Sequence, residues 1–273
     1  GEGLPLPVMR VTLPARVRGD NATVTKSNVI PFAPPRRDND AAVQRVLQAM
    51  NVRLEQLPPL RPTAFEACVA HLVGGPRQLL ELPFGQRRLV ALRDAFFTAH
   101  GREHEMRRLW RESVATACNA VALARVLGLD EPCIAAAALL HRVAEVWLLA
   151  TLADAEALTG DRLRSAAVRE LLASRSRQLA PRIVRAWALT PAVSQPLLGW
   201  RECGEDARGG LPPTLPARLI YLGSLIAAEQ LYEGYCTPGL VESAAHQLGL
   251  DQDVLLVARG QSADIHALLT QIV

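Results

Sequence analysis

The stretch EPCIAAAALLHRVAEVWLLATL, residues 131–152, decides the fold because it is apolar on nearly every side of a helical wheel. Such a helix must be covered all round by other elements, so we expect a central, buried helix over about 131–152. The polar residues in its middle are His141, Arg142 and Glu145. On one helix, His141 and Glu145 would lie about 40° apart, and Arg142 would reach Glu145. This polar notch either meets water, pairs locally or marks a functional site.

The composition around this stretch also favours helices. Of 273 residues, 49% are apolar but only 4% aromatic, so the core must consist of Leu, Ala and Val. Leu and Ala propagate helices, whereas strands prefer β-branched and aromatic residues. The predicted fold is therefore an irregular all-α, multi-helix bundle. Other helices are expected over 41–50, 62–73, 84–99, 104–127, 162–174, 176–188, 191–202, 215–233, 239–248 and 251–270.

Residues 1–38 differ from the rest of the chain because six prolines interrupt short β-branched stretches. Proline removes a hydrogen-bond donor and blocks helix formation, so this segment is predicted to be an extended arm or linker. The helical domain is expected to cover 39–273.

Cysteine usage and apolar run lengths bear on the cellular compartment. The five cysteines are scattered and contain no CxxC pair, which is typical of reduced thiols in a cytoplasmic protein. The longest apolar run, Cys133–Leu140, is shorter than the ~18 residues of a membrane span. No secretion signal is visible at the start of the chain. We therefore expect a cytoplasmic protein with no membrane segment.

Four landmarks in order give the chain a family resemblance. They are Leu-Trp-Arg-Glu-Ser at 109–113, Ala-Leu-Leu-His-Arg at 138–142, Trp-Ala-Leu-Thr-Pro at 187–191 and Ala-Arg-Leu-Ile-Tyr-Leu at 217–222. Over about 104–233 this pattern resembles the HDOD domain, a bacterial signalling branch related to the HD metal-dependent phosphohydrolases. The resemblance implies a shortened N-terminal helical lobe over 39–103 and an HD-like lobe over 104–273.

The chain departs from the HD pattern at the positions that hold the metal in the enzymes. The resemblance places Glu112 at the first histidine, Arg142 at the aspartate of the His-Asp pair, and Ser224 at the distant aspartate. Only His141 keeps its type. Arginine carries a permanent charge and has no lone pair to donate, so we expect no metal, no cofactor and no catalytic residues.

These substitutions suggest a replacement for the metal. An acid at 112 and a base at 142 would fill the former site with a salt bridge, with Glu145 as a second partner. We therefore predict that Arg142 contacts Glu112 or Glu145, the alternative being that the side chains point independently to solvent. The family's later histidine pair corresponds to a position near Trp200 and Arg201. These two residues could line a small pocket, the alternative for Trp200 being a place in the core.

Arginines gather in two runs that need a separate interpretation. The runs are Arg102, Arg107, Arg108 and Arg111, then Arg162, Arg164, Arg169, Arg175, Arg177, Arg182 and Arg185. Such runs bind phosphates or, more often, form solvated helix faces with interspersed acids. Because the net charge is only +3, nucleic acid is not an expected partner.

The leading functional hypothesis is a non-catalytic regulatory or scaffolding module of bacterial signalling that acts by protein–protein contact. The family resemblance implies a signalling protein as partner or a link to cyclic dinucleotide pathways. Two alternatives remain. One is a residual metal-dependent phosphohydrolase using His141 with Glu112 or Glu145, and the other is a nucleotide- or nucleic-acid-binding module using the arginine runs.

Overall fold

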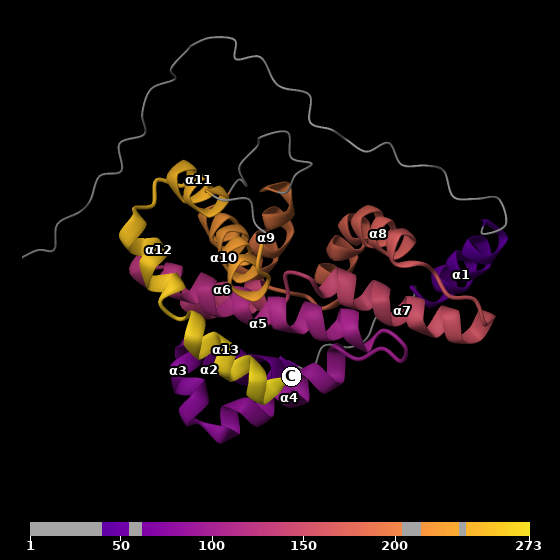
Figure 1. Cartoon of the computed structure of the whole chain (residues 1–273), viewed down its shortest axis with the longest axis horizontal. Helices are drawn as coiled ribbons and strands as arrows, with labels where there is room; N and C mark the ends of the chain where they lie inside the picture. Colours follow the sequence, from indigo (N-terminus) through magenta and orange to yellow (C-terminus); the bar gives the residue numbers. More distant parts are fainter. Residues whose placement is uncertain (1–39, 55–61, 204–213, 235–238) are drawn as a thin grey trace, which may run out of the picture. The chain divides into compact units, whose positions relative to one another are not determined.

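The computed structural model describes residues 40–54, 62–203, 214–234 and 239–273, which fold into helices with no strand among them (Figure 1). The prediction of an all-α, multi-helix bundle is confirmed. Residues 1–38, the predicted arm, lie outside the described residues, and its boundary stays a prediction.

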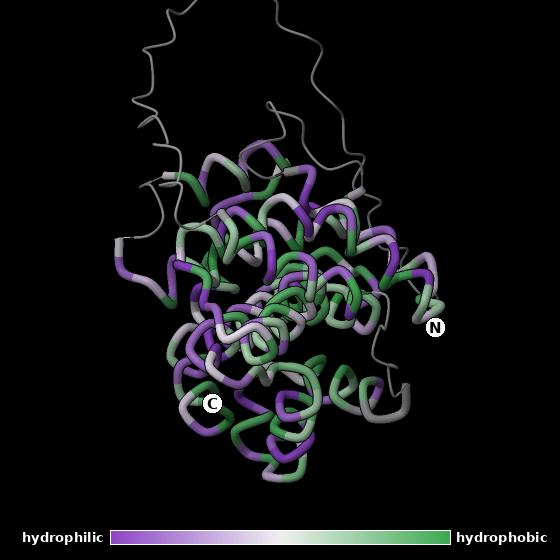
Figure 2. The backbone as a smooth tube through the Cα atoms, turned by 90° about the vertical axis from the view of Figure 1, so that its right-hand side faces the viewer, coloured by the Kyte–Doolittle hydropathy of each residue, from purple (hydrophilic) through white to green (hydrophobic). Residues whose placement is uncertain are grey.

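The helices follow one another along the chain with short connections. Their bounds are α1 (Asp40–Arg53), α2 (Pro62–Val73), α3 (Gly75–Glu81), α4 (Pro83–Phe96), α5 (Glu103–Val126), α6 (Glu131–Leu139), α7 (Val143–Thr159), α8 (Ser165–Ala186), α9 (Pro191–Gly199), the 3₁₀ helix η2 (Trp200–Cys203), α10 (Leu215–Leu231), α11 (Leu240–Gln247), α12 (Gln252–Arg259) and α13 (Ser262–Ile272). Figure 2 shows apolar and polar residues mixed along the outer helices, as amphipathic packing requires.

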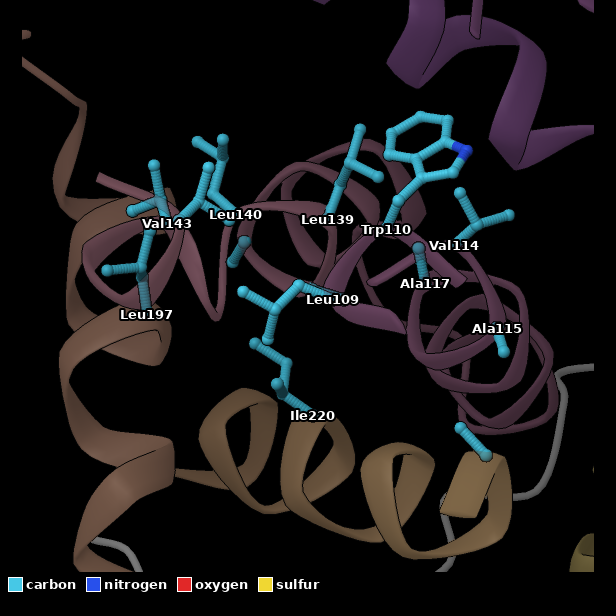
Figure 3. Packing of buried hydrophobic residues seen from close by; sticks show 14 of the residues in the cluster. Leu109, Trp110, Val114, Ala115, Ala117, Leu139, Leu140, Val143, Leu197 and Ile220 are labelled. Atoms are coloured by element: carbon cyan, nitrogen blue, oxygen red, sulfur yellow. The ribbon is translucent and has the colours of Figure 1, made fainter. Parts of the chain in front are cut away.

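Helix α5 is the central element of the bundle, packing on α10 and α6. Its apolar residues from Met106 to Ala124 are buried. Leu109 of α5 and Ile220 of α10 point toward one another in the core (Figure 3). The α5–α10 crossing is close because α10 carries Gly223, where a Cβ would lie 3.1 Å from the carbonyl oxygen of Thr116.

The predicted single helix over 131–152 is wrong, although its burial is confirmed. The chain forms α6 and α7, with a turn over Leu140–Arg142. By length and composition the joined segment Glu131–Thr159 is apolar enough to cross a membrane, with a mean hydropathy of 1.6, but 78% of its most apolar window is buried inside the fold. Such burial is typical of a core helix.

Other boundaries differ for local reasons. The predicted helices over 162–174 and 176–188 form one helix, α8, because the sequence between them contains no glycine or proline. The predicted helix over 251–270 instead divides at Gly260 into α12 and α13, since glycine is a poor helix former. Between the predicted helices over 62–73 and 84–99 the chain forms an additional short helix, α3, with proline in its first turn.

Candidate functional site

The turn between α6 and α7 places His141 and Arg142 at the centre of the site. The His141 ring Nδ1 lies 2.6 Å from the carbonyl oxygen of Ala138. In a continuous helix this carbonyl oxygen would accept a hydrogen bond from the backbone N–H of Arg142. Here the imidazole occupies that acceptor, which interrupts the backbone hydrogen bonding of the helix. The sequence-based placement of His141 and Glu145 on one helical face is therefore wrong: His141 lies in the turn and Glu145 in the first turn of α7.

His141 is a neutral imidazole in the folded chain. Burial, followed by the nearby positive charge of Arg142, lowers the pKa of His141 to about 3. Because a carbonyl oxygen only accepts, Nδ1 must carry the proton and Nε2 a lone pair. Nε2 is buried and makes no hydrogen bond within the described part of the chain. Its lone pair is the one feature of the site that still resembles a metal ligand.

Arg142 pairs with two carboxylates on two helices. Its Nε lies 3.0 Å from Oε2 of Glu112 on α5, an ion pair whose alignment falls short of a hydrogen bond. Its guanidinium also donates to Oε2 of Glu145 at 2.8 Å. The prediction that Arg142 contacts Glu112 or Glu145 is confirmed for both residues. The arginine thus ties α5 to the start of α7.

A second arginine completes what we call the charged cluster, namely Glu112, Arg142, Glu145 and Arg201. Arg201, in η2, donates to Oε1 of Glu145 at 2.7 Å and to the hydroxyl of Ser176 on α8 at 2.9 Å. Burial alone would raise the pKa of Glu145, but the two guanidiniums outweigh it and hold this pKa at about 2. The carboxylate therefore stays charged at every physiological pH.

Trp200 packs the cluster against the core. Its indole N–H donates to the carbonyl oxygen of His141 at 3.0 Å, and its ring meets the imidazole edge-on with centroids 4.8 Å apart. The Arg201 guanidinium lies 4.9 Å from the Trp200 ring centroid. Trp200 is buried, so the core interpretation of this residue is confirmed. Both residues that were expected near the former histidine pair lie at the cluster.

Two further residues at the cluster were not predicted. Ser176 accepts a hydrogen bond from Arg201, and the Tyr232 hydroxyl lies within the electrostatic influence of Glu112. Burial and then the charge of Glu112 raise the pKa of Tyr232. Neither residue belongs to a motif, and each lies far along the chain from its partner, so no local pattern marks them. Ser224, the remaining predicted position, uses its hydroxyl within α10, donating to the carbonyl oxygen of Tyr221 at 2.7 Å.

Comparison with known proteins supports the family assignment. Residues 87–199 match the HDOD domain family, so the resemblance to this family is confirmed over this part of the chain. The match contains Glu112, His141, Arg142 and Glu145, and it ends before Trp200. No curated protein matches the sequence.

A solved structure shares the fold. It is described as "Putative metal-dependent phosphohydrolase from Shewanella amazonensis SB2B", with 14% identity and a TM-score of 0.53. The alignment covers 90% of this chain and 93% of the other. At this identity the likeness establishes the all-α HD-like fold alone.

The residues present do not fit the divalent metal that this fold family implies. The part of the chain that the structure describes contains no group of three or more His, Cys, Asp or Glu side chains arranged to hold an ion. At the cluster, His141 offers one lone pair, while Glu112 is committed to Arg142. A fixed guanidinium beside the imidazole would repel a cation. The arrangement is suited to holding helices together.

Proposed function

We propose that this chain is a non-catalytic regulatory or scaffolding module of bacterial signalling that acts by protein–protein contact. The observation that carries the proposal is the position of the Arg142 guanidinium, between Glu112 and Glu145, at the place where the HD pattern has a metal-binding aspartate. The HDOD match over 87–199 supports a signalling-associated HD-related domain. The partner is expected to be a signalling protein, with cyclic dinucleotide pathways as the family-implied context, and the compartment to be the cytoplasm.

The chemistry of the cluster supports the absence of hydrolysis. HD-type hydrolysis needs a metal that polarises the phosphoryl group and activates water. Here the charged side chains of the cluster neutralise one another. The His141 imidazole is neutral and hydrogen-bonded to a backbone carbonyl oxygen. These groups can fix the relative placement of α5, α7, α8 and η2, which a binding module requires.

A second candidate function, residual phosphohydrolysis, rests on the unpartnered Nε2 of His141. Both proposals are tested by incubating the purified chain with bis(p-nitrophenyl) phosphate and added Mn²⁺, Fe²⁺ or Zn²⁺. We expect no hydrolysis above that of the metal in buffer. Metal-dependent hydrolysis that disappears in His141→Ala but persists in the exposed control His104→Ala would reject the non-catalytic proposal and favour the enzyme.

A further inference from the structure

The second arginine run gives α8 and the residues just before it a basic surface with fewer paired carboxylates than the first run has. In the first run, Arg102 is buried against Glu156 and Glu105, and Arg108 lies 3.6 Å from Glu112. Carboxylates of the bundle therefore neutralise part of that run. The interpretation as a solvated face with interspersed acids fits the first run only in part, because Arg102 is buried. The second run is accompanied by Asp161 and Glu170.

Along 162–185 the balance of charge is strongly positive. Six arginines here are exposed, namely Arg162, Arg164, Arg169, Arg177, Arg182 and Arg185, and Arg175 is half-buried. The one carboxylate on α8 is Glu170, and Asp161, just before the run, is bound by Arg45. No ion pair joins Arg164, Arg169 or Arg175 to a carboxylate in the described ranges.

The surface is long and accessible. Helix α8 packs mainly on α7 and touches α9, and its arginines other than Arg175 are exposed. At about 1.5 Å per residue, the arginines from 164 to 185 extend over about 30 Å. Guanidiniums bind phosphate oxygens with paired hydrogen bonds, and a linear polyanion can engage many of them at once.

An aromatic cavity adjoins the last turns of α8. It has a volume of about 130 Å³ and is lined by Ile183 and Trp187 of α8, Phe96 of α4 and Trp147 of α7. The Trp147 indole N–H makes no hydrogen bond within the described part of the chain. Aromatic rings beside a basic track are the combination that binds single-stranded nucleic acid, because exposed bases stack on the rings while phosphates follow the charges.

We propose that the α8 surface, defined by its arginines from 162 to 185 together with the Trp147–Trp187 cavity, binds single-stranded nucleic acid without sequence preference. This goes beyond the proposed scaffolding role and does not depend on the metal question. The modest charge of the whole chain does not oppose it, because the field at a surface follows the local charges within about a Debye length.

The test is fluorescence anisotropy of a labelled single-stranded oligothymidylate of about 20 nucleotides with the full chain. We expect binding at about 50 mM salt that weakens steeply by about 200 mM. The triple variant Arg164→Glu/Arg169→Glu/Arg185→Glu should raise Kd at least about tenfold and reduce the slope of log K against log salt by about two. Trp147→Leu should weaken single-strand binding about fivefold or more and leave duplex binding unchanged.

The matched control is Arg77→Glu/Arg87→Glu/Arg107→Glu, the same charge change at exposed positions on other helices. It should leave Kd near the wild-type value, and circular dichroism of both variants should match that of the wild type. Absence of binding at low salt, or equal weakening by both triple variants, would overturn the proposal. Competition by polyglutamate as strong as by unlabelled oligonucleotide would also overturn it, assigning the surface to an acidic protein instead.

Discussion

Glu145 is the residue on which the charged cluster depends most. It is buried and accepts hydrogen bonds from both Arg142 and Arg201. The pair energy of buried ions is largely offset by desolvation, but removal of one partner leaves the others uncompensated. The cluster therefore fixes geometry more than it adds stability, and its loss is nevertheless costly.

Glu145→Gln should destabilise the fold by about 3 kcal/mol, because two partly buried guanidiniums lose the buried carboxylate charge that they share. Urea denaturation monitored by circular dichroism measures this change. The control is Glu66→Gln, on the exposed face of α2, which should change the free energy of unfolding by less than about 0.5 kcal/mol. Equal effects of the two substitutions would show that the cluster is not a buried ionic network.

His141 makes the stability of the chain depend on pH. Its pKa is lowered to about 3 in the folded state from 6.5, so the unfolded chain binds a proton that the folded chain rejects. The stabilising contribution is complete above about pH 6.5 and is lost as the pH falls toward about 3. Glu145, with a folded pKa of about 2 against 4.5, adds a loss only below about pH 4.5.

Between pH 6.5 and 4.5 the two groups are therefore separable. The wild-type chain should lose up to about 1.4 kcal/mol of stability per pH unit in this window from His141 alone. His141→Leu cannot titrate and should show a correspondingly flatter profile, although it is less stable at pH 7. Denaturant titrations at half-unit pH steps measure both slopes, and parallel profiles would show that His141 is protonated in the folded state.

Among the elements, the contact of α5 with α10 is central to the packing of the bundle. Gly223 permits it, because a Cβ there would lie 3.1 Å from both the Ala120 nitrogen and the Thr116 carbonyl oxygen. These are backbone atoms of a packed helix and cannot rotate away. The close approach is thus set by the absence of one side chain.

Gly223→Leu should destabilise the chain by about 3 kcal/mol, since a large side chain must force α10 away from α5. Thermal and urea unfolding measure the effect. Ala173→Leu adds a similar bulk at an exposed position of α8 and should be close to neutral. A Gly223→Leu chain as stable as the wild type would show that the helices are not in close contact.

The turn between α6 and α7 depends on a single side chain, that of His141. The sequence there reads as uninterrupted helix, with neither glycine nor proline. The break follows from the hydrogen bond between the His141 ring and the Ala138 carbonyl oxygen. Here a side chain competes with a backbone N–H for the same carbonyl acceptor. Periodicity reports which face of a segment is apolar, and it carries no information on this competition.

For the whole molecule, the sequence predicted the all-α class, the burial of 131–152 and the pairing of Arg142. These depend on composition, local spacing and the family pattern. The interactions of Ser176 with Arg201 and of Tyr232 with Glu112 were not predictable, because residues distant in sequence meet only through the packing of α8 and α10. The charge balance around each arginine run was also not predictable from the sequence alone. Both runs are rich in arginine, and the structure shows that they differ in how many carboxylates pair with them.

We propose that the charged cluster takes the place of the metal of HD-type sites. The most direct measurement is the metal content of the purified chain by mass spectrometry after incubation with Mn²⁺, Fe²⁺ or Zn²⁺ and desalting. The wild-type chain should retain far less than one ion per molecule. Glu112→His/Arg142→Asp/Ser224→Asp, which restores the ligand types implied by the family pattern, should retain more. A stoichiometric ion in the wild type that is lost in His141→Ala would show that the chain keeps a metal site and that the cluster has not replaced it.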